Sequence, residues 1–557
     1  MTAPTAPTHL RRRPSRRPLT LLVAGLVTVL GLGHSTTPTD AQWTDQAYAE
    51  GAVATGWWAE SLARAQLIEV DGLGLDVLDV TTTDAEYPAD PGPTTSAIDV
   101  AALESLVGLE IPALQLPLVG DGSNGGLLDL GDAAGAGLLN GYASATDHSL
   151  ATAASGTVTD DGALNLSPVE DPSDTDLTRL DLTALLDDHR VSGLTDAVVD
   201  EVSLGLGALA STASWEAGGT PSSDYVLAGA ELQISSPAVG QLVTGLTGAV
   251  STLNDRLNSL LGPEGPLQVA LDGLGEVLDL RIPLLLTLDV DRLNVHARVE
   301  LASLTDELLR EPRTSEDGLI TLDVSSGTIA VDLSRLSDGG DLNEMPPSSE
   351  LLTAENTTRI VTSVTDLLAT LITGVEDAVT QAVTGTGILV TADAELSLLG
   401  ILLPPTAEVS ITIDTTVRDI LDRDGARPGI SIEGDLLGIP LVTLVGRLLE
   451  PVVETVLPAL LSPLTSVLEE VPGLVEEVVA PVVRGVSGTL SPVLAPLLSQ
   501  LLQLTVNEQE LTGPEGEETF TARALTVELL PVLGDASVTV GLASSSVRVW
   551  RPSGATE

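Results

Sequence analysis

The sequence predicts an α+β fold in which antiparallel β-sheets pack against long aliphatic amphipathic helices. Some short segments alternate apolar and polar residues, as strands with one buried face do. Longer segments place apolar residues every three or four positions, as helices with one buried face do. Of the 557 residues, 43% are hydrophobic but only 2% are aromatic, so the core must be built from aliphatic side chains.

Residues 1–41 are expected to be a signal peptide. Its arginines are Arg11, Arg12, Arg13, Arg16 and Arg17, and the apolar run Leu19–Leu32 follows them. That run is shorter than the roughly 20 residues of a membrane-spanning helix, which favours cleavage near Ala41 over a retained anchor. The arginine pair leaves general secretion and twin-arginine export both open.

The segment 42–95 is expected to be a short helix followed by a linker. Trp43, Tyr48, Trp57 and Trp58 lie in a stretch rich in Ala and Glu. They fit packing side chains better than an exposed binding patch. Residues 81–95 are rich in Thr, Asp and Pro, which is typical of a linker. A boundary near residue 95 follows from this composition.

The segment 96–202 is expected to be mixed and to contain β-hairpins. Residues 157–159 and 163–166 alternate around the turn signal Asp160-Asp161-Gly162. A clearer hairpin is predicted further along the chain, because Ile320–Ser325 and Ile329–Leu333 alternate on either side of Ser326-Gly327.

The central α+β region, 203–428, is expected to hold two long helices. The first has a heptad stripe between a proline start signal and the stop signal Gly262-Pro263. This stripe comprises Val239, Val243, Leu246, Val250, Leu253, Leu257 and Leu260. The second helix is expected within 348–384, with Ile360, Val364, Leu367, Leu371 and Val375 on one face. Each stripe requires a partner surface.

The C-terminal α+β region, 429–557, is expected to combine Pro-interrupted helices with final strands. Seven prolines break the apolar run 441–504, which predicts short or kinked helices, and its glutamates argue against a membrane span. Residues 520–530 and 536–550 alternate as strands. The order of strands, helix and strands recurs in 203–300, 318–413 and 429–550. Either a repeated β-α-β arrangement or one large α+β body would produce this order.

Composition excludes several classes of function. The chain has no cysteine and no lysine, which excludes disulfides, thiolate chemistry, Schiff-base lysines and P-loops. A net charge of −55 argues against nucleic acid as a partner. This acidity fits a solubilising surface better than a site for a cationic ligand. The scarcity of aromatic residues disfavours a carbohydrate enzyme.

No catalytic, cofactor-binding or metal-binding residue is predicted. His148, His189 and His296 lack partners at metal-ligand spacing, and Gly141–Ala145 lacks the last glycine of a nucleophile elbow. Asp422–Gly425 is only a fragment of a calcium loop, so a solvated turn is favoured over a structural ion.

Several phrases, in this order, resemble the actinobacterial choice-of-anchor G family. They are Leu138–Ala143, Ala153–Val158, Asp224–Gly229, Ser235–Val239, Ile329–Leu333 and Leu342–Pro347. The resemblance covers roughly residues 40–545 and implies a secreted protein of undescribed molecular function, whose relatives differ in how their C-termini attach to the envelope. Residues 549–557 contain no LPxTG-like motif, which favours release or non-covalent retention.

These observations lead to one expected function and one alternative. The chain is expected to be an exported, non-enzymatic structural or interaction protein, secreted or loosely bound to the cell surface. Candidate partners are envelope components or further copies of the chain, with no nucleic acid and no transmembrane segment in the mature protein. The alternative is a secreted carrier that binds lipid or lipoglycan in an aliphatic groove.

Overall fold

The computed structural model describes most of the chain between residues 60 and 550. The described ranges are 60–71, 82–97, 110–111, 116–117, 127–129, 139–165, 178–183, 185, 197–274, 280–282, 286–302, 309–337, 339–398, 406–422, 428–433, 435–436, 439–440, 449–532 and 537–550. All of them belong to one compact unit, Ala59–Glu557. The predicted α+β class is confirmed, because the described strands form four antiparallel sheets of five or more strands with helices packed against them.

Sheet A joins strands from the two ends of the described chain. Its six strands run in the order β19 (Ser349–Glu350), β25 (Leu502–Thr512), β26 (Thr519–Leu529), β27 (Val538–Arg548), β1 (Ser61–Asp71) and β2 (Thr82–Tyr87). The predicted final strands are therefore confirmed as β26 and β27, and β27 pairs with β1.

Sheet B packs face to face against sheet A. Its strands run in the order β12 (Ser222–Ala228), β11 (Ala208–Glu216), β8 (Leu150–Gly156), β7 (Asn140–Asp147) and β3 (Thr94–Ala97). The interface is a cluster of small side chains with a few larger ones: Ala63, Ala85, Ala143, Ala145, Ala151, Ala153, Ala213, Trp215, Phe520, Ala522, Val547 and Val549. Sheets A and B thus form a sandwich with an alanine-rich core.

Sheet C supplies one wall of the helical core. Its strands run in the order β16 (Arg313–Thr314), β17 (Ile320–Asp323), β18 (Thr328–Asp332), β13 (Glu231–Ser235), β10 (Glu201–Leu206), β9 (Thr178–Asp181) and β6 (Leu128–Asp129). The hairpin predicted around Ser326-Gly327 is confirmed as β17 and β18. Its apolar residues Ile320, Leu322 and Ile329 are fully buried, as the alternation requires.

Sheet D has one apolar and one acidic face. Its strands run in the order β14 (Leu280–Ile282), β15 (Leu286–Ala297), β20 (Gly387–Leu398), β21 (Thr406–Thr416) and β22 (Gly429–Glu433). Along β20, Ile388 and Val390 are buried while Asp393 and Glu395 are exposed. Two-stranded pairs, β4 (Glu110–Ile111) with β5 (Leu116–Pro117) and β23 (Asp435–Leu436) with β24 (Ile439–Pro440), complete the described strands.

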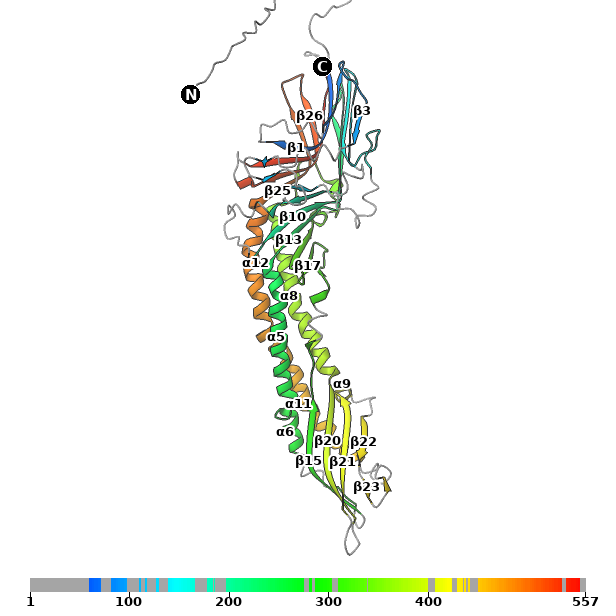
Figure 1. The fold of residues 1–557 in the computed structure, drawn as a ribbon, viewed down its shortest axis with the longest axis vertical. Coiled ribbons are helices and arrows are strands. Elements are labelled where there is room, and N and C mark those ends of the chain that lie inside the picture. Colours follow the sequence, from blue (N-terminus) through cyan, green and yellow to red (C-terminus); the bar gives the residue numbers. More distant parts are fainter. Residues whose placement is uncertain are drawn as a thin grey trace, which may run out of the picture. The chain divides into compact units, whose positions relative to one another are not determined.

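Four long helices connect these sheets and pack together (Figure 1). They are α5 (Pro237–Leu261), α8 (Ala354–Gly385), α11 (Leu449–Val478) and α12 (Ala480–Leu501), with the short helices α6 (Pro266–Asp272) and α9 (Val417–Leu421) nearby. Helices α5 and α8 lead toward strands of sheet D, whereas α11 and α12 lead from sheet D to β25 of sheet A. Helices α5 and α8 therefore run in one direction between the sheets, and α11 and α12 run in the other.

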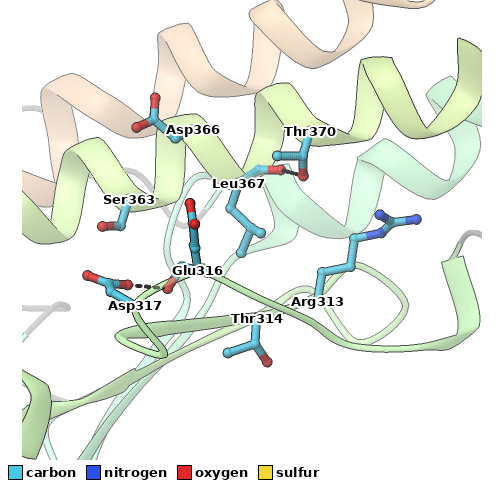
Figure 2. A pocket seen from close by; sticks show the side chains of 9 residues that line it. Arg313, Thr314, Glu316, Asp317, Ser363, Asp366, Leu367 and Thr370 are labelled. Carbon is cyan, nitrogen blue, oxygen red and sulfur yellow. Dashed lines mark hydrogen bonds between the residues drawn. The ribbon is translucent and has the colours of Figure 1, made fainter.

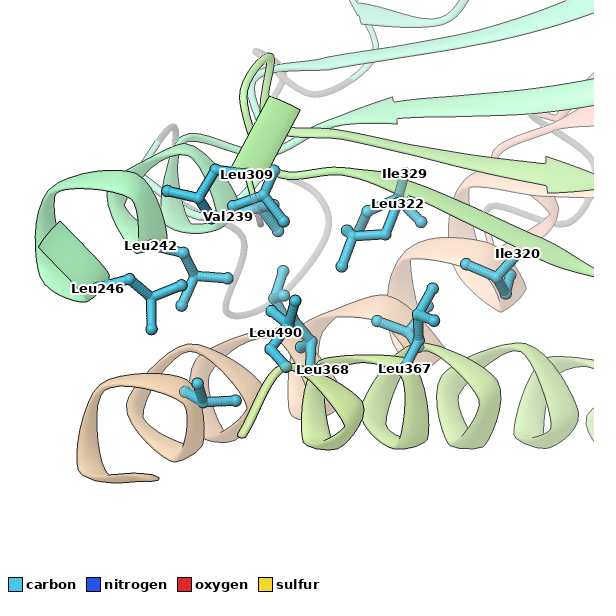
Figure 3. Packing of buried hydrophobic residues seen from close by; sticks show 14 of the residues in the cluster. Val239, Leu242, Leu246, Leu309, Ile320, Leu322, Ile329, Leu367, Leu368 and Leu490 are labelled. Atoms are coloured by element: carbon cyan, nitrogen blue, oxygen red, sulfur yellow. The ribbon is translucent and has the colours of Figure 1, made fainter. Parts of the chain in front are cut away.

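The predicted helix stripes are the buried faces. Five of the seven stripe residues of α5 are buried, Val243 and Leu260 being half-buried, and the five named residues of α8 are all buried. Ser236 begins α5, because its side chain accepts a hydrogen bond from the backbone N–H of Val239 at 3.3 Å. Figure 3 shows side chains of α5, sheet C, α8 and α12 meeting in one aliphatic core.

The prolines of the C-terminal region do not make its helices short. Helix α11 has 30 residues and contains Pro458, Pro463 and Pro472, and α12 has 22 residues and contains Pro492 and Pro496. All five are exposed or half-buried. A carbonyl that loses its helical partner on the outer side can still bond to water, which explains why long helices tolerate these prolines.

Two helical segments are long and apolar enough to cross a membrane, judged by length and composition alone. They are Ala354–Gly385 and Val453–Leu501, with mean hydropathies of 1.2 and 1.4. Core helices pass the same test. Both segments bury aliphatic side chains against the other long helices, while Glu469, Glu470, Glu476 and Glu477 are exposed. In the most apolar part of each segment, 33% and 28% of the residues are buried, so this packing accounts for part of their apolar character.

Two expectations for the N-terminal half need correction. Of the segment 42–95, residues 61–66 are part of strand β1 instead of a helix, and the predicted linker contains β2 and the start of β3. Pairing with β1 and β7 outweighs the local linker composition. The hairpin predicted around Asp160-Asp161-Gly162 is present but short, with one bridge between Val158 and Leu164 and backbone hydrogen bonds from Thr159 to Ala163 and from Asn165 to Thr157.

Candidate functional site

An open cavity of about 780 Å³ lies between helix α8 and the segment that contains β16 (Figure 2). Arg313, Glu316 and Asp317 come from the β16 segment, while Ser363, Asp366 and Leu367 come from α8. Figure 2 shows Glu316 pointing from the turn toward α8. The cavity is therefore lined by charges of both signs, with the leucine as an apolar part of its wall.

The turn that carries two of these carboxylates is fixed by its own hydrogen bonds. Ser315 donates from Oγ to Oδ1 of Asp317 at 2.7 Å, and the backbone N–H of Leu319 donates to the same oxygen at 3.1 Å. Gly318 has a φ of 73°, a conformation that glycine adopts without the steric cost of a Cβ atom. These contacts hold the position of Asp317 before any ligand arrives.

An arginine of α8 neutralises Asp317. Arg359 donates from Nη2 to Oδ2 of Asp317 at 2.9 Å and from Nη1 to the carbonyl of Arg335 at 2.9 Å. Burial alone would raise the pKa of Asp317, but the bonds from Ser315 and Leu319 together with Arg359 lower it below its ordinary value. Asp317 is therefore an ionised structural group near neutral pH. Because a general acid needs a raised pKa, Asp317 is not suited to that role.

The other three charged side chains of the cavity are not paired with neighbouring residues. In the part of the chain that the structure describes, the side chains of Arg313, Glu316 and Asp366 have no hydrogen-bond or ion-pair partner. Leu367 is only 6% exposed, so it is fixed by the core behind it. This arrangement can bind a charged ligand without first breaking an internal ion pair.

A second cavity, of about 470 Å³, lies over sheet C. Unlike those of the first cavity, its charged side chains have partners. Its Arg179 donates from Nη2 to Ser203 at 2.8 Å, Glu201 at 3.1 Å and Gln233 at 3.2 Å. Asp332, also in its lining, lies 3.5 Å from Nε of Arg335. Because these charges already have partners, the first cavity is the better candidate for a binding site.

The structure places the histidines apart from both cavities. His148 lies in the turn between β7 and β8, with its ring centroid 6.4 Å from that of Tyr87, and His296 is exposed on β15. His189 and most of the segment Asp422–Gly425 lie outside the described residues. Among the residues that are described, no group of three or more His, Asp or Glu side chains is placed to hold a metal ion.

The segment Gly141–Ala145 is part of strand β7 inside the sandwich. A Cβ atom on Gly141 would lie 2.4 Å from Oγ1 of Thr83, which is too close for any side chain. Glycine at this position therefore serves the close approach of sheets A and B.

Sequence reasoning missed the cavity residues. Residues 313–317 and 363–370 are distant in sequence and share no motif, and only the packing of β17 and its turn against α8 brings them together. The local signal was the turn phrase Ser315-Glu316-Asp317-Gly318, which indicates a turn but no ligand.

Two of the sequence segments that carry the family resemblance, Asp224–Gly229 and Leu342–Pro347, contact each other in the structure. The Tyr225 hydroxyl donates to the carbonyl of Leu342 and accepts from the backbone N–H of Met345 at 3.1 Å. Asn343 accepts from the backbone N–H of Leu227 at 2.7 Å. Burial raises the pKa of Tyr225, which keeps its hydroxyl a donor. These residues thus join β12 to the 3₁₀ turn η5 (Leu342–Glu344) and serve the fold.

A family model described as "Domain of unknown function (DUF8394)" matches residues 65–548. This match covers most of the chain, and the protein belongs to that family. No curated protein and no solved structure matches the chain.

Proposed function

We propose that this member of the DUF8394 family is an exported, non-enzymatic protein of the cell exterior that acts as a structural or interaction protein. The observation that carries the proposal is the N-terminal sequence, in which an arginine-rich segment precedes the apolar run Leu19–Leu32. The resemblance to choice-of-anchor G proteins supports the same location. An interaction role is supported by the cavity beside α8, whose free charges suit ligand binding.

The packing of the long helices also supports a structural role. One aliphatic cluster contains side chains from sheets A, B, C and D and from all four long helices. Because these elements share one core, a load applied to one sheet is transmitted to the others through close-packed side chains. Such a body suits a surface protein that must keep its form without disulfides.

The alternative role, a carrier of lipid or lipoglycan, needs an apolar cavity. The two cavities described above are lined mainly by charged and hydroxyl-bearing residues. The buried aliphatic faces of α5 and α8 already pack against other elements. The structural or interaction role is therefore the better supported of the two.

Export can be tested by producing the full chain with its own N-terminus in an actinobacterial host. The chain in the cytoplasm, the envelope and the medium would be measured by immunoblotting, and its mass by mass spectrometry. We expect a processed chain beginning near residue 42 in the medium or the envelope fraction. A full-length chain confined to the cytoplasm would contradict export.

The processed protein then separates the two roles. Native mass spectrometry and organic extraction would look for bound lipid, and co-sedimentation with isolated envelopes would look for binding. We expect sedimentation with the envelope, or self-association, without acyl-bearing adducts. Reproducible acyl adducts at stoichiometric amounts would favour the carrier instead.

A further inference from the structure

The cavity between α8 and the β16 segment has a charge pattern that defines its ligand. Asp317 is neutralised by Arg359 at 2.9 Å, which leaves Arg313 as one free cation and Glu316 and Asp366 as two free anions. A ligand that complements these groups must carry a carboxylate for the arginine and at least one ammonium group for the acids.

The uncharged part of the lining adds a second requirement. Leu367 is fixed by the core and lies between the charged groups in Figure 2. Aliphatic stems of basic side chains pack along such apolar surface while their heads remain with carboxylates and water. The hydroxyl group of Ser363 on α8 can bond to peptide groups. Free amino acids are small for this cavity, whose 780 Å³ is within the usual range of ligand pockets.

We propose that this cavity binds a short lysine-containing peptide through its free carboxyl terminus and its side-chain ammonium group. Arg313 holds the terminal carboxylate, Glu316 and Asp366 hold the ammonium group, and Leu367 contacts the aliphatic stem. The chain contains no lysine of its own, so its own side chains do not offer a competing ammonium group. Its net charge of −55 also favours the approach of cationic peptides.

This inference deepens the proposed interaction role and rests on it. Its test uses purified processed protein, so a failure of peptide binding leaves the export experiment unaffected. The probe is the tripeptide Gly-Lys-Gly, measured by isothermal titration calorimetry at low salt. Two modified probes accompany it, the same peptide with a C-terminal amide and the same peptide with an acetylated lysine side chain.

The matched variants lie on one helix. Asp366→Asn removes a carboxylate of the cavity, while Asp377→Asn removes an exposed carboxylate eleven residues further along α8, on nearly the same helix face and outside the cavity. Arg313→Gln removes the cation. All three residues are exposed or half-buried, so the variants are expected to fold, and equal thermal melting curves would verify this.

We expect saturable binding of the free tripeptide with one site. Asp366→Asn should weaken it about tenfold or more, as the loss of one charge-assisted contact does, and Asp377→Asn should leave it unchanged. Arg313→Gln should weaken the free peptide and have little effect on the amide. Absence of saturable binding overturns the proposal, and so does equal weakening by Asp366→Asn and Asp377→Asn. Equal binding of the free peptide and its amide would reduce the site to a cation site and would also overturn it.

Discussion

The sandwich of sheets A and B and the core of the long helices are packed with different side chains. The sandwich interface is mainly alanine, with Trp215 and Phe520 among its few large residues. The helical core is almost entirely leucine, valine and isoleucine. Sheets can lie close together when small side chains separate them, whereas longer aliphatic side chains fill the space between the helices and the sheets that they cover.

Contacts across the sandwich show how close the approach is. Oγ of Ser211 on β11 lies 2.8 Å from Oγ of Ser545 on β27, and Ser545 donates to the carbonyl of Ser211 at 3.1 Å. Polar backbone and hydroxyl groups of the two sheets therefore touch directly. The two cores should therefore lose stability through opposite substitutions. Enlarging a side chain should destabilise the sandwich, and shortening one should destabilise the helical core.

The largest effect is expected at an arginine on the outer face of sheet A. Arg523 is 9% exposed and bonds to Glu69 at 2.8 and 3.0 Å and to Glu508 at 3.1 Å. Arg523→Met should lower the free energy of unfolding by about 3–5 kcal/mol, because the carboxylates lose their shared cation. Urea unfolding at pH 7, followed by circular dichroism, measures this loss.

The control lies on the same sheet. Arg64 pairs with Asp84 at 2.7 Å, but both side chains are more than 40% exposed. Arg64→Met should therefore cost about 1 kcal/mol or less. Similar losses for the two variants would show that burial of Arg523 adds nothing to its ion pairs.

The helical core should respond to truncation. Leu368 on α8 is fully buried among the side chains of Figure 3, and Leu368→Ala should cost about 2–5 kcal/mol through lost burial and the cavity left behind. Leu511→Ala is the control, since Leu511 is 56% exposed. An equally small cost at both positions would contradict a tightly packed helical core.

The sandwich should respond to enlargement. Ala153 on β8 is fully buried at the interface, and Ala153→Leu should cost about 1–3 kcal/mol because the facing sheet has no room for the added atoms. Thr152→Leu places the same side chain on the other face of β8 and should cost less. If Ala153→Leu leaves the free energy of unfolding unchanged, the alanine interface is packed less tightly than its contacts indicate.

Periodicity predicted the helical core better than the sandwich. The stripes of α5 and α8 follow from sequence because one buried face of a long helix repeats many times. Strands β2 and β3 have the local composition of a linker, because their short Thr-rich segments acquire strand structure only from pairing with β1 and β7. The pairing of β1 with β27 joins residues at opposite ends of the chain, which no local pattern predicts.

The same limit applies to the cavity beside α8. Arg313 and Asp366 are ordinary surface charges in the sequence, and only tertiary packing makes them neighbours. Tyr225 and Asn343, by contrast, lie in segments that the sequence analysis singled out, and they maintain contacts between elements. Recognisable residues here serve the fold, while candidate binding residues carry no local signal.

The smallest effect expected is a change in the acid sensitivity of the sandwich. Burial would raise the pKa of Glu69, but its bonds to Arg523 outweigh burial and lower it below the ordinary value of 4.5. Ionised Glu69 therefore stabilises the fold at neutral pH, and this contribution is lost as the pH falls through the lowered pKa. Glu69→Gln should be less stable than the unaltered protein at pH 7, and the difference should shrink as the pH is lowered below 4.5. Urea unfolding at a series of pH values measures this difference, with Glu216→Gln, at the exposed last residue of β11, as the control. Asp317 and Asp323 also have lowered pKa values, but they are present in both proteins and cancel in the comparison. A difference that stays constant with pH would mean that Glu69 acts in the sandwich through its shape and hydrogen bonds and not through its charge.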